Sequence, residues 1–178
     1  NVMMGYYKEE KMTQEVMSGD YFHTGDIGIV DDEGFLKITD RKKEMFKTSG
    51  GKYIAPQVIE SQMKQSLFIE QIMVVGAGRR MATAIIQPNI DHVMNWFNEN
   101  GIKCDSLSKA VQEPTLKKVI EAEVEHHNQN FGSWEQVKKI ELTPDEWSID
   151  EGHLTPTMKL KRKVISEKYS DLIDNMYN

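Results

Sequence analysis

Cysteine is almost missing from this sequence, since Cys104 is the only one in 178 residues. A single thiol excludes an internal disulfide, so the fold cannot depend on the cross-links that stabilise small secreted domains. One cysteine is typical of a reducing compartment, and we expect a cytoplasmic protein. No sequence neighbour of Cys104 would activate it as a nucleophile, which favours a loop or packing role.

Long apolar runs are missing too. No stretch approaches the ~18 apolar residues that a membrane-spanning helix requires. Residues 1–11 lack a basic segment followed by an apolar one, so no signal peptide is visible. The chain begins with Asn1, which we interpret as a piece of a longer polypeptide. We therefore expect no transmembrane segment here and leave peripheral membrane contact open.

Positive charge is in deficit, because 22 Lys and Arg face 28 Asp and Glu and leave a net charge of −6. General nucleic-acid binding relies on a basic face, so we expect no nucleic-acid partner. His126 and His127 have no cysteine or carboxylate at metal spacing, and we interpret them as a surface and a core residue. Trp96, Trp134 and Trp147 are expected in the core, since no basic residues interleave with them. The phosphate-binding pattern GxxxxGK[ST] and internal repeats are absent.

The residues that are present, 39% hydrophobic and 28% charged, are typical of a globular protein. Short apolar runs predict strands, the first two of which flank the turn sequence DDEG as a hairpin. The predicted strands cover residues 27–30, 35–39, 72–78, 82–88 and 137–142.

Apolar residues at helical spacing predict four helices. One begins at Pro56, and a second is capped by Asp91. A third follows Pro114 and ends at Gly132, and a last helix covers residues 164–176. The turn-rich residues 143–157 are expected to be irregular or to form a loose hairpin. Together these elements predict an α+β fold, a small mixed β-sheet covered by helices and preceded by a β-hairpin.

The sequence YFHTGDIG carries the first candidate site residue, Asp26. A TGD turn at a strand end projects one carboxylate, which can accept two hydrogen bonds from the vicinal hydroxyls of a ribose. The same aspartate can equally satisfy the amides of its own turn. The tripeptide alone favours the second interpretation.

The second candidate is ITDRKKEMFKTSGGKYIAP, in which the charged run at residues 40–43 marks a boundary between two subdomains. Arg41 can hold a phosphate or a ribose. Gly50 and Gly51 let a ligand approach the backbone closely. Taken alone, the same residues are typical of a charged linker followed by a flexible turn.

The third candidate is LTPTMKLKRKVI, residues 154–165, which gathers the cations Lys159, Lys161, Arg162 and Lys163 within five residues. They cannot share one face in either a strand or a helix. Three interpretations are open: a patch for nucleic acid or anionic membrane, the solvated start of a helix, and a lysine that handles phosphate. Cations at a helix N-terminus oppose the dipole, so something other than helix stability favours them here.

Taken in order, NVMMGYYKEE, YFHTGD, GFLKITDRKKEMFKTSGGKYIAPQVIE and LTPTMKLKRKVI resemble the C-terminal part of the adenylate-forming superfamily. That superfamily includes acyl-CoA synthetases, luciferases and the adenylation domains of peptide synthetases. KTSGGKYIAPQ and LTPTMKLKRK look most like long-chain fatty acyl-CoA ligases. The resemblance covers nearly the whole chain.

The resemblance implies a two-step reaction. A fatty acid and ATP give an acyl-adenylate and pyrophosphate, and the thiol of CoA then displaces AMP. Residues 1–39 would be the tail end of the large N-terminal domain, residues 40–43 a hinge, and residues 44–178 a mobile C-terminal domain that rotates between the two steps. ATP and Mg²⁺ would be bound mainly by the N-terminal domain, which is the expected partner. This piece alone would then fold but not catalyse.

Site residues follow from the same resemblance. Asp26 matches the acid that holds the ATP ribose, and Arg41 an arginine near the ribose and phosphate. Lys43 falls at the hinge, where many relatives have aspartate and luciferases have lysine. Gly50 and Gly51 both fit the glycine beside the CoA tunnel, because counting from either side gives a different one.

Lys159 matches the lysine that bridges the acid carboxylate and the α-phosphate during adenylation. Many relatives have Ser-Gly before this lysine, whereas this chain has Thr157-Met158. Lys161, Arg162 and Lys163 are then expected to begin a solvated helix that anchors the loop. Two alternatives stay open: an enzyme that delivers its acyl group to a carrier protein, and a basic-patch module that binds anionic surfaces.

Overall fold

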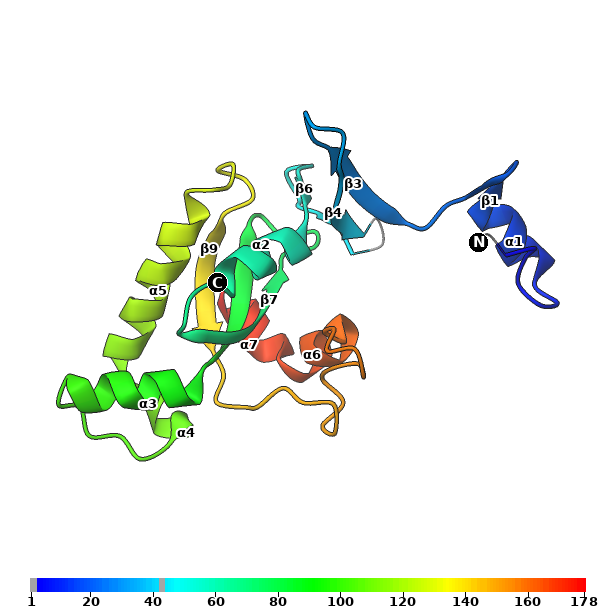
Figure 1. The fold of residues 1–178 in the computed structure, drawn as a ribbon. Coiled ribbons are helices and arrows are strands. Elements are labelled where there is room, and N and C mark those ends of the chain that lie inside the picture. Colours follow the sequence, from blue (N-terminus) through cyan, green and yellow to red (C-terminus); the bar gives the residue numbers. More distant parts are fainter. Residues whose placement is uncertain (1–2, 42–43) are drawn as a thin grey trace. The chain divides into compact units, whose positions relative to one another are not determined.

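The computed structural model describes residues 3–41 and 44–178 (Figure 1). The chain forms two compact units, Asn1–Met45 and Phe46–Asn178. The assignment of residues 1–39 to a larger N-terminal domain and of 40–43 to a hinge stays a prediction. Lys43 lies outside the described residues.

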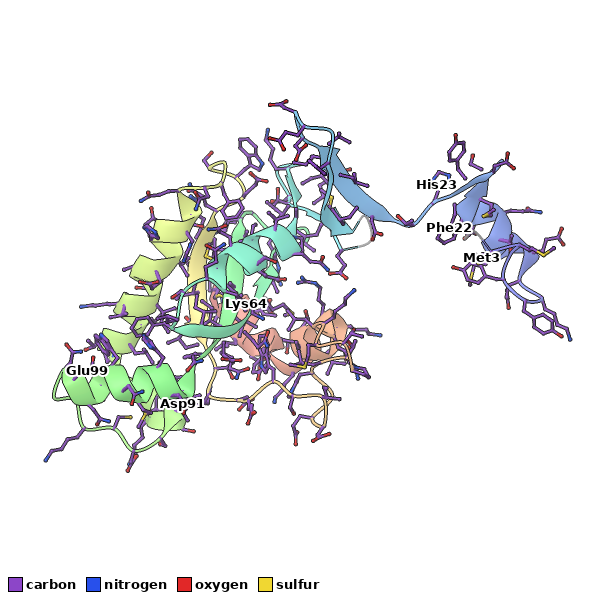
Figure 2. The ribbon with its side chains drawn as sticks, viewed as in Figure 1. Met3, Phe22, His23, Lys64, Asp91 and Glu99 are labelled. Carbon is purple, nitrogen blue, oxygen red and sulfur yellow. The ribbon has the colours of Figure 1, made fainter. Side chains whose placement is uncertain are left out.

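The described residues of the first unit form one short helix and two strand pairs. Strand β3 (Asp26–Val30) pairs antiparallel with β4 (Leu36–Arg41), so the predicted hairpin is confirmed. Helix α1 (Glu10–Val16) was not predicted, because it has no buried residue and no side-chain cap. It precedes β1 (Met17–Ser18) and β2 (Tyr21–Phe22), and Figure 2 labels Phe22 at the end of that pair.

The second unit is built on a three-stranded sheet in the order β7–β8–β9. Strand β7 (Ile69–Val75) runs antiparallel to β8 (Ala82–Pro88), and β8 runs parallel to β9 (Val137–Leu142). The predicted mixed sheet is therefore confirmed. A separate two-stranded hairpin, β5 (Phe46–Lys47) with β6 (Tyr53–Ile54), precedes it.

Helices connect and cover this sheet. Helix α2 packs against β7 and α5, and α5 packs against β9 (Figure 1). The helices of the unit are α2 (Pro56–Met63), α3 (Ile90–Glu99), α4 (Leu107–Ala110), α5 (Pro114–Asn128), α6 (Arg162–Lys168) and α7 (Ser170–Asn175).

The two faces of the sheet are buried in two different cores. Successive side chains of a strand point to opposite faces, so Ile72 and Ile86 enter the first core, with α2, α3 and α5. Their neighbours Met73 and Ile85 enter the second core, built by residues of the last third of the chain: Trp147, Ile165, Tyr169 and Met176. Burial on both faces explains the apolar runs at residues 72–75 of β7 and 84–86 of β8.

Two predicted helix boundaries were wrong. Asn89, not Asp91, caps α3, since its side chain accepts the N–H of His92 at 2.9 Å. Asp91 lies in the first turn, as labelled in Figure 2. Helix α5 ends at Asn128 and not at Gly132. The Asn128 amide exchanges two hydrogen bonds with the backbone of Val137, at 2.9 and 3.0 Å, and so turns the chain toward β9.

The predicted last helix is two short helices that meet at Tyr169. The Tyr169 ring lies in the second core, and its hydroxyl donates to Asp145 Oδ2 at 2.7 Å. Trp147 is buried as expected, whereas Trp134 is 50% exposed and is not a core residue. His127 is buried and His126 exposed, as predicted.

Candidate functional site

Lys159 lies at the end of a tight hairpin between β9 and α6. The Thr155 carbonyl accepts the N–H of Met158 at 2.8 Å, and the Thr155 N–H donates to the Lys159 carbonyl at 2.8 Å. The Thr155 hydroxyl accepts the N–H of Lys159 at 3.1 Å, and Leu154 bridges to Leu160 below the turn. The side chain of Lys159 is exposed. The predicted turn is therefore a closed loop that presents one ammonium group to solvent.

Met158, directly before the lysine, has a φ of +60°. A side chain in this left-handed region costs about 1–2 kcal/mol, because Cβ approaches the following carbonyl. Glycine takes the same conformation without that cost. The loop thus keeps a glycine-like backbone although its sequence is Thr157-Met158.

A second loop, Thr48–Lys52, repeats this hydrogen-bond pattern. The Thr48 N–H donates to the Lys52 carbonyl at 2.9 Å, and the Gly51 N–H donates to the Thr48 carbonyl at 2.9 Å. The Thr48 hydroxyl accepts the N–H of Lys52 at 3.2 Å. Both loops run from a threonine to a lysine four residues later. Both resemble the three-residue hairpin loop in which a left-handed residue follows a tight turn.

The two candidate tunnel glycines differ in conformation. Gly51 has a φ of +80°, whereas Gly50 has no left-handed φ. A Cβ on Gly51 would meet only Lys47 Cε, at 3.7 Å, so backbone conformation rather than space requires the glycine there. Both glycines are exposed.

Asp26 and Arg41 are brought together by the first hairpin. They are register partners at the first residue of β3 and the last of β4. The Asp26 N–H donates to Thr24 Oγ1 at 3.1 Å, and Gly25 before it has a φ of +77°. The structure describes only the backbone of Arg41. Two residues 15 apart in sequence thus share one strand end.

Arg162 is not the solvated helix residue that the sequence predicted. Its guanidinium binds Glu60 with two hydrogen bonds, Nη1 to Oε1 at 2.9 Å and Nη2 to Oε2 at 2.6 Å. The side chains are 24% and 9% exposed. Lys161 and Lys163 are exposed, so the prediction holds for them. A signal was available, because Glu60 stands between Ile59 and Met63 on the buried side of α2.

His153, two residues before the Lys159 loop, is buried and joins an ionic cluster. Its Nε2 lies 3.2 Å from Lys168 Nζ, which pairs with Asp145 Oδ2 at 2.8 Å. Burial, and then the neighbouring Lys168 charge, lower the pKa of His153. Hydrogen bonds from Lys168 and Tyr169 lower the pKa of Asp145. Burial and the Lys168 charge thus both favour the neutral form of the imidazole.

The second unit matches a known family. The sequence model described as AMP-binding enzyme C-terminal domain matches residues 44–178. The chain belongs to this family. It is 38% identical over 178 residues to the long-chain-fatty-acid–CoA ligase FadD15 of Mycobacterium tuberculosis, and 37% identical over 182 residues to the human long-chain-fatty-acid–CoA ligase 1.

The AMP-binding C-terminal domain and its preceding unit make up only part of those relatives. The matches cover 99% and 100% of this chain but 30% and 26% of the two ligases. Among solved structures, the adenylation domain of a Mycobacterium chelonae carboxylate reductase is similar, with a TM-score of 0.78 and 22% identity. That match covers 98% of this chain and 26% of the other. It supports the predicted fold.

The described residues contain neither a cluster of metal ligands nor a membrane-spanning helix. Across residues 3–41 and 44–178, no three His, Cys, Asp or Glu gather as metal ligands. The same residues contain no helix with the length and apolar character needed to traverse a bilayer.

Proposed function

We propose that this chain is the C-terminal part of an ATP-dependent, AMP-forming long-chain fatty acid–CoA ligase. The observation that carries the proposal is an exposed lysine, Lys159, on a closed hairpin of an AMP-binding C-terminal domain. The ligases to which the chain is similar are named for fatty acids and CoA. This favours CoA over a carrier protein as the acceptor of the acyl group.

Lys159 would act in the first half-reaction. Attack of a carboxylate on the α-phosphorus of ATP gathers negative charge on neighbouring oxygens, and a nearby ammonium stabilises that charge in the transition state. Lysine suits this role because its charge is compact and its stem flexible. The hydrogen-bonded backbone of residues 155–159 fixes the Cα atom of Lys159, from which the flexible side chain extends.

The remaining site residues would divide between the nucleotide and the thiol. Asp26 and Arg41 would bind the ribose and phosphate, which their register pairing at one strand end supports. Gly50 and Gly51 would line the CoA tunnel, supported by the exposed loop and the left-handed Gly51. Lys43 would act as the hinge between residues 1–39 and the mobile domain 44–178.

ATP and CoA are the co-substrates of this proposal, and Mg²⁺ would be held by residues of the larger N-terminal domain. Bound Mg²⁺ supplies charge neutralisation on the ATP phosphates. We also propose a cytoplasmic location, supported by the single cysteine.

The test is an assay of the complete polypeptide with palmitate, ATP and either CoA or a phosphopantetheinylated carrier protein. We expect AMP and pyrophosphate, and palmitoyl-CoA as the thioester. The 178-residue chain alone is the negative control and should form no acyl-adenylate. Release of ADP instead of AMP, or acylation of the carrier protein only, would contradict the proposal.

A further inference from the structure

One carboxylate joins three elements of the second unit. Glu60 on α2 accepts the N–H of Val74 on β7 at 2.7 Å, besides the two bonds from Arg162 at the start of α6. A two-pronged contact between guanidinium and carboxylate fixes orientation as well as distance. Glu60 and Arg162 are 102 residues apart in sequence, so the pair sets where α6 begins relative to the sheet.

The Lys159 hairpin is connected to this pair by consecutive bonds. Leu160 bridges to Leu154, and the Lys161 N–H donates to the His153 carbonyl at 2.8 Å. Arg162 is the next residue. Each residue from the lysine to the arginine is therefore held, and a shift of Arg162 would be passed to the lysine.

The other loop is held differently. The Ser49 N–H donates to the Arg79 carbonyl at 2.8 Å, and the Gly78 N–H donates to the Lys47 carbonyl at 2.8 Å. These backbone bonds fix the Thr48–Lys52 loop against the turn between β7 and β8. A change in the Glu60–Arg162 pair should therefore affect the Lys159 hairpin and leave the Thr48–Lys52 loop in place.

We propose that Arg162 and Glu60 are positioning residues for Lys159. They hold its hairpin in the position that the adenylation step requires. This inference rests on the proposed function of Lys159. A misplacement of about 1 Å at a reacting group can cost about 10²-fold in rate. The pair therefore belongs to the first half-reaction and not to the second.

The chain offers a second long-range ion pair, more exposed than the first, as a control. Arg79 pairs with Asp174 and so ties the turn between β7 and β8 to α7, with side chains 48% and 58% exposed. This pair also joins distant segments, but it does not adjoin the Lys159 hairpin in sequence. An exposed pair contributes less stability than a partly buried one, so this control tests whether losing any long-range ion pair lowers adenylation, and the second half-reaction reports a general loss of stability.

The experiment uses the complete polypeptide with Glu60→Gln, Arg162→Lys and Arg162→Ala, and Asp174→Asn as control. Glu60→Gln keeps an acceptor for Val74 but removes the ion pair. We expect the adenylation kcat, followed by pyrophosphate release, to fall about 10²-fold with little change in the KM for ATP. Conversion of pre-formed acyl-adenylate to acyl-CoA should stay near wild type. Arg162→Lys should retain more activity than Arg162→Ala, because lysine keeps the charge but not the two-pronged geometry.

Hydrogen exchange at the amides of Met158 and Lys159 gives a readout independent of activity. We expect faster exchange in Glu60→Gln than in wild type, and no change in Asp174→Asn. Equal losses in both half-reactions, an equal loss in the control, or unchanged exchange would each overturn the inference. A wild-type polypeptide that forms no acyl-adenylate would refute the proposed function, and the exchange result would still decide whether the pair holds the hairpin. If Arg162→Ala does not fold, Arg162→Lys and Glu60→Gln carry the test.

Discussion

The loops Thr48–Lys52 and Thr155–Lys159 share one backbone design and differ in what surrounds it. In both, the N–H of the first residue, a threonine, donates to the carbonyl of the last residue, a lysine. Both lysines are exposed, but the Lys52 ammonium lies 5.3 Å from the centre of the Trp134 ring, whereas Lys159 lies three residues before Arg162, which pairs with Glu60. We propose a substrate contact for Lys159 alone. Backbone geometry alone does not assign the chemistry.

The largest expected difference lies between the two lysines. Lys159→Ala in the complete polypeptide should lower the adenylation rate by about 10²–10³-fold, the usual effect of removing one transition-state donor. Lys52→Ala should leave adenylation near wild type. The measurement is pyrophosphate release with palmitate and ATP.

Acyl transfer from pre-formed acyl-adenylate to CoA serves as the control for Lys159→Ala and should be largely unaffected. Equal losses for the two lysine variants in adenylation would show that the loops are interchangeable in function. Equal losses of the two half-reactions in Lys159→Ala would argue against its proposed role.

A smaller difference is expected in stability, between substitutions at the two left-handed residues Gly51 and Met158. Gly51→Ala places a Cβ at a φ of +80° and should destabilise the domain by about 1–2 kcal/mol. Met158→Gly relieves the same strain at +60° but gives the unfolded chain more freedom, so its stability should stay within about 1 kcal/mol of wild type. Urea unfolding measures both, and a destabilisation by Met158→Gly larger than that by Gly51→Ala would contradict this account.

The smallest effect should come from pH. The pKa of His153 is lowered by burial, so protonation favours the unfolded state. The stability that the neutral imidazole contributes to the fold is fully present above the ordinary histidine pKa. It is lost as pH falls through the lowered pKa of the folded state. We expect Tm to fall over this window.

His153→Gln should flatten that part of the pH profile, measured by thermal unfolding between neutral pH and pH 5. The pKa of Asp145 is also lowered, so the stability that its carboxylate contributes is lost as pH falls below the ordinary aspartate pKa. An unchanged pH dependence in His153→Gln would place the titrating group elsewhere. The backbone bonds that hold the Thr48–Lys52 loop do not titrate, so acid should loosen the Lys159 hairpin first.

Local patterns predicted most of the fold. The DDEG hairpin, the paired apolar strands and the start of α5 at Pro114 follow from turn residues and periodicity, and each is confirmed. The end of α5 was missed because it depends on the bond between Asn128 and Val137, a contact made only after the chain folds back. The break at Tyr169 likewise depends on its ring and hydroxyl in the second core.

The candidate site shows the same division. The turns that carry Gly50, Gly51 and Lys159 could be predicted from the sequences SGG and Thr-Pro-Thr, and the structure contains both. The ion pair of Arg162 could not be predicted, because a cation in a run of cations is expected to be solvated until its partner is known. Its partner Glu60 lies in another helix 102 residues away. The sequence does show that Glu60 lies on the buried side of α2 and needs a partner, but it does not show which cation that partner is.

The two-sided sheet has a consequence for how the domain opens. Residues after β9 supply most of the second core, Trp147, Ile165, Tyr169 and Met176, while the first core closes without them. The segment that carries Lys159 can therefore detach as a sub-global unit while the larger core stays folded. We expect a chain that ends at Leu142 to keep the first core but to expose Met73 and Ile85, which are fully buried in the intact domain. Because exposed apolar surface favours association, this shorter chain should self-associate.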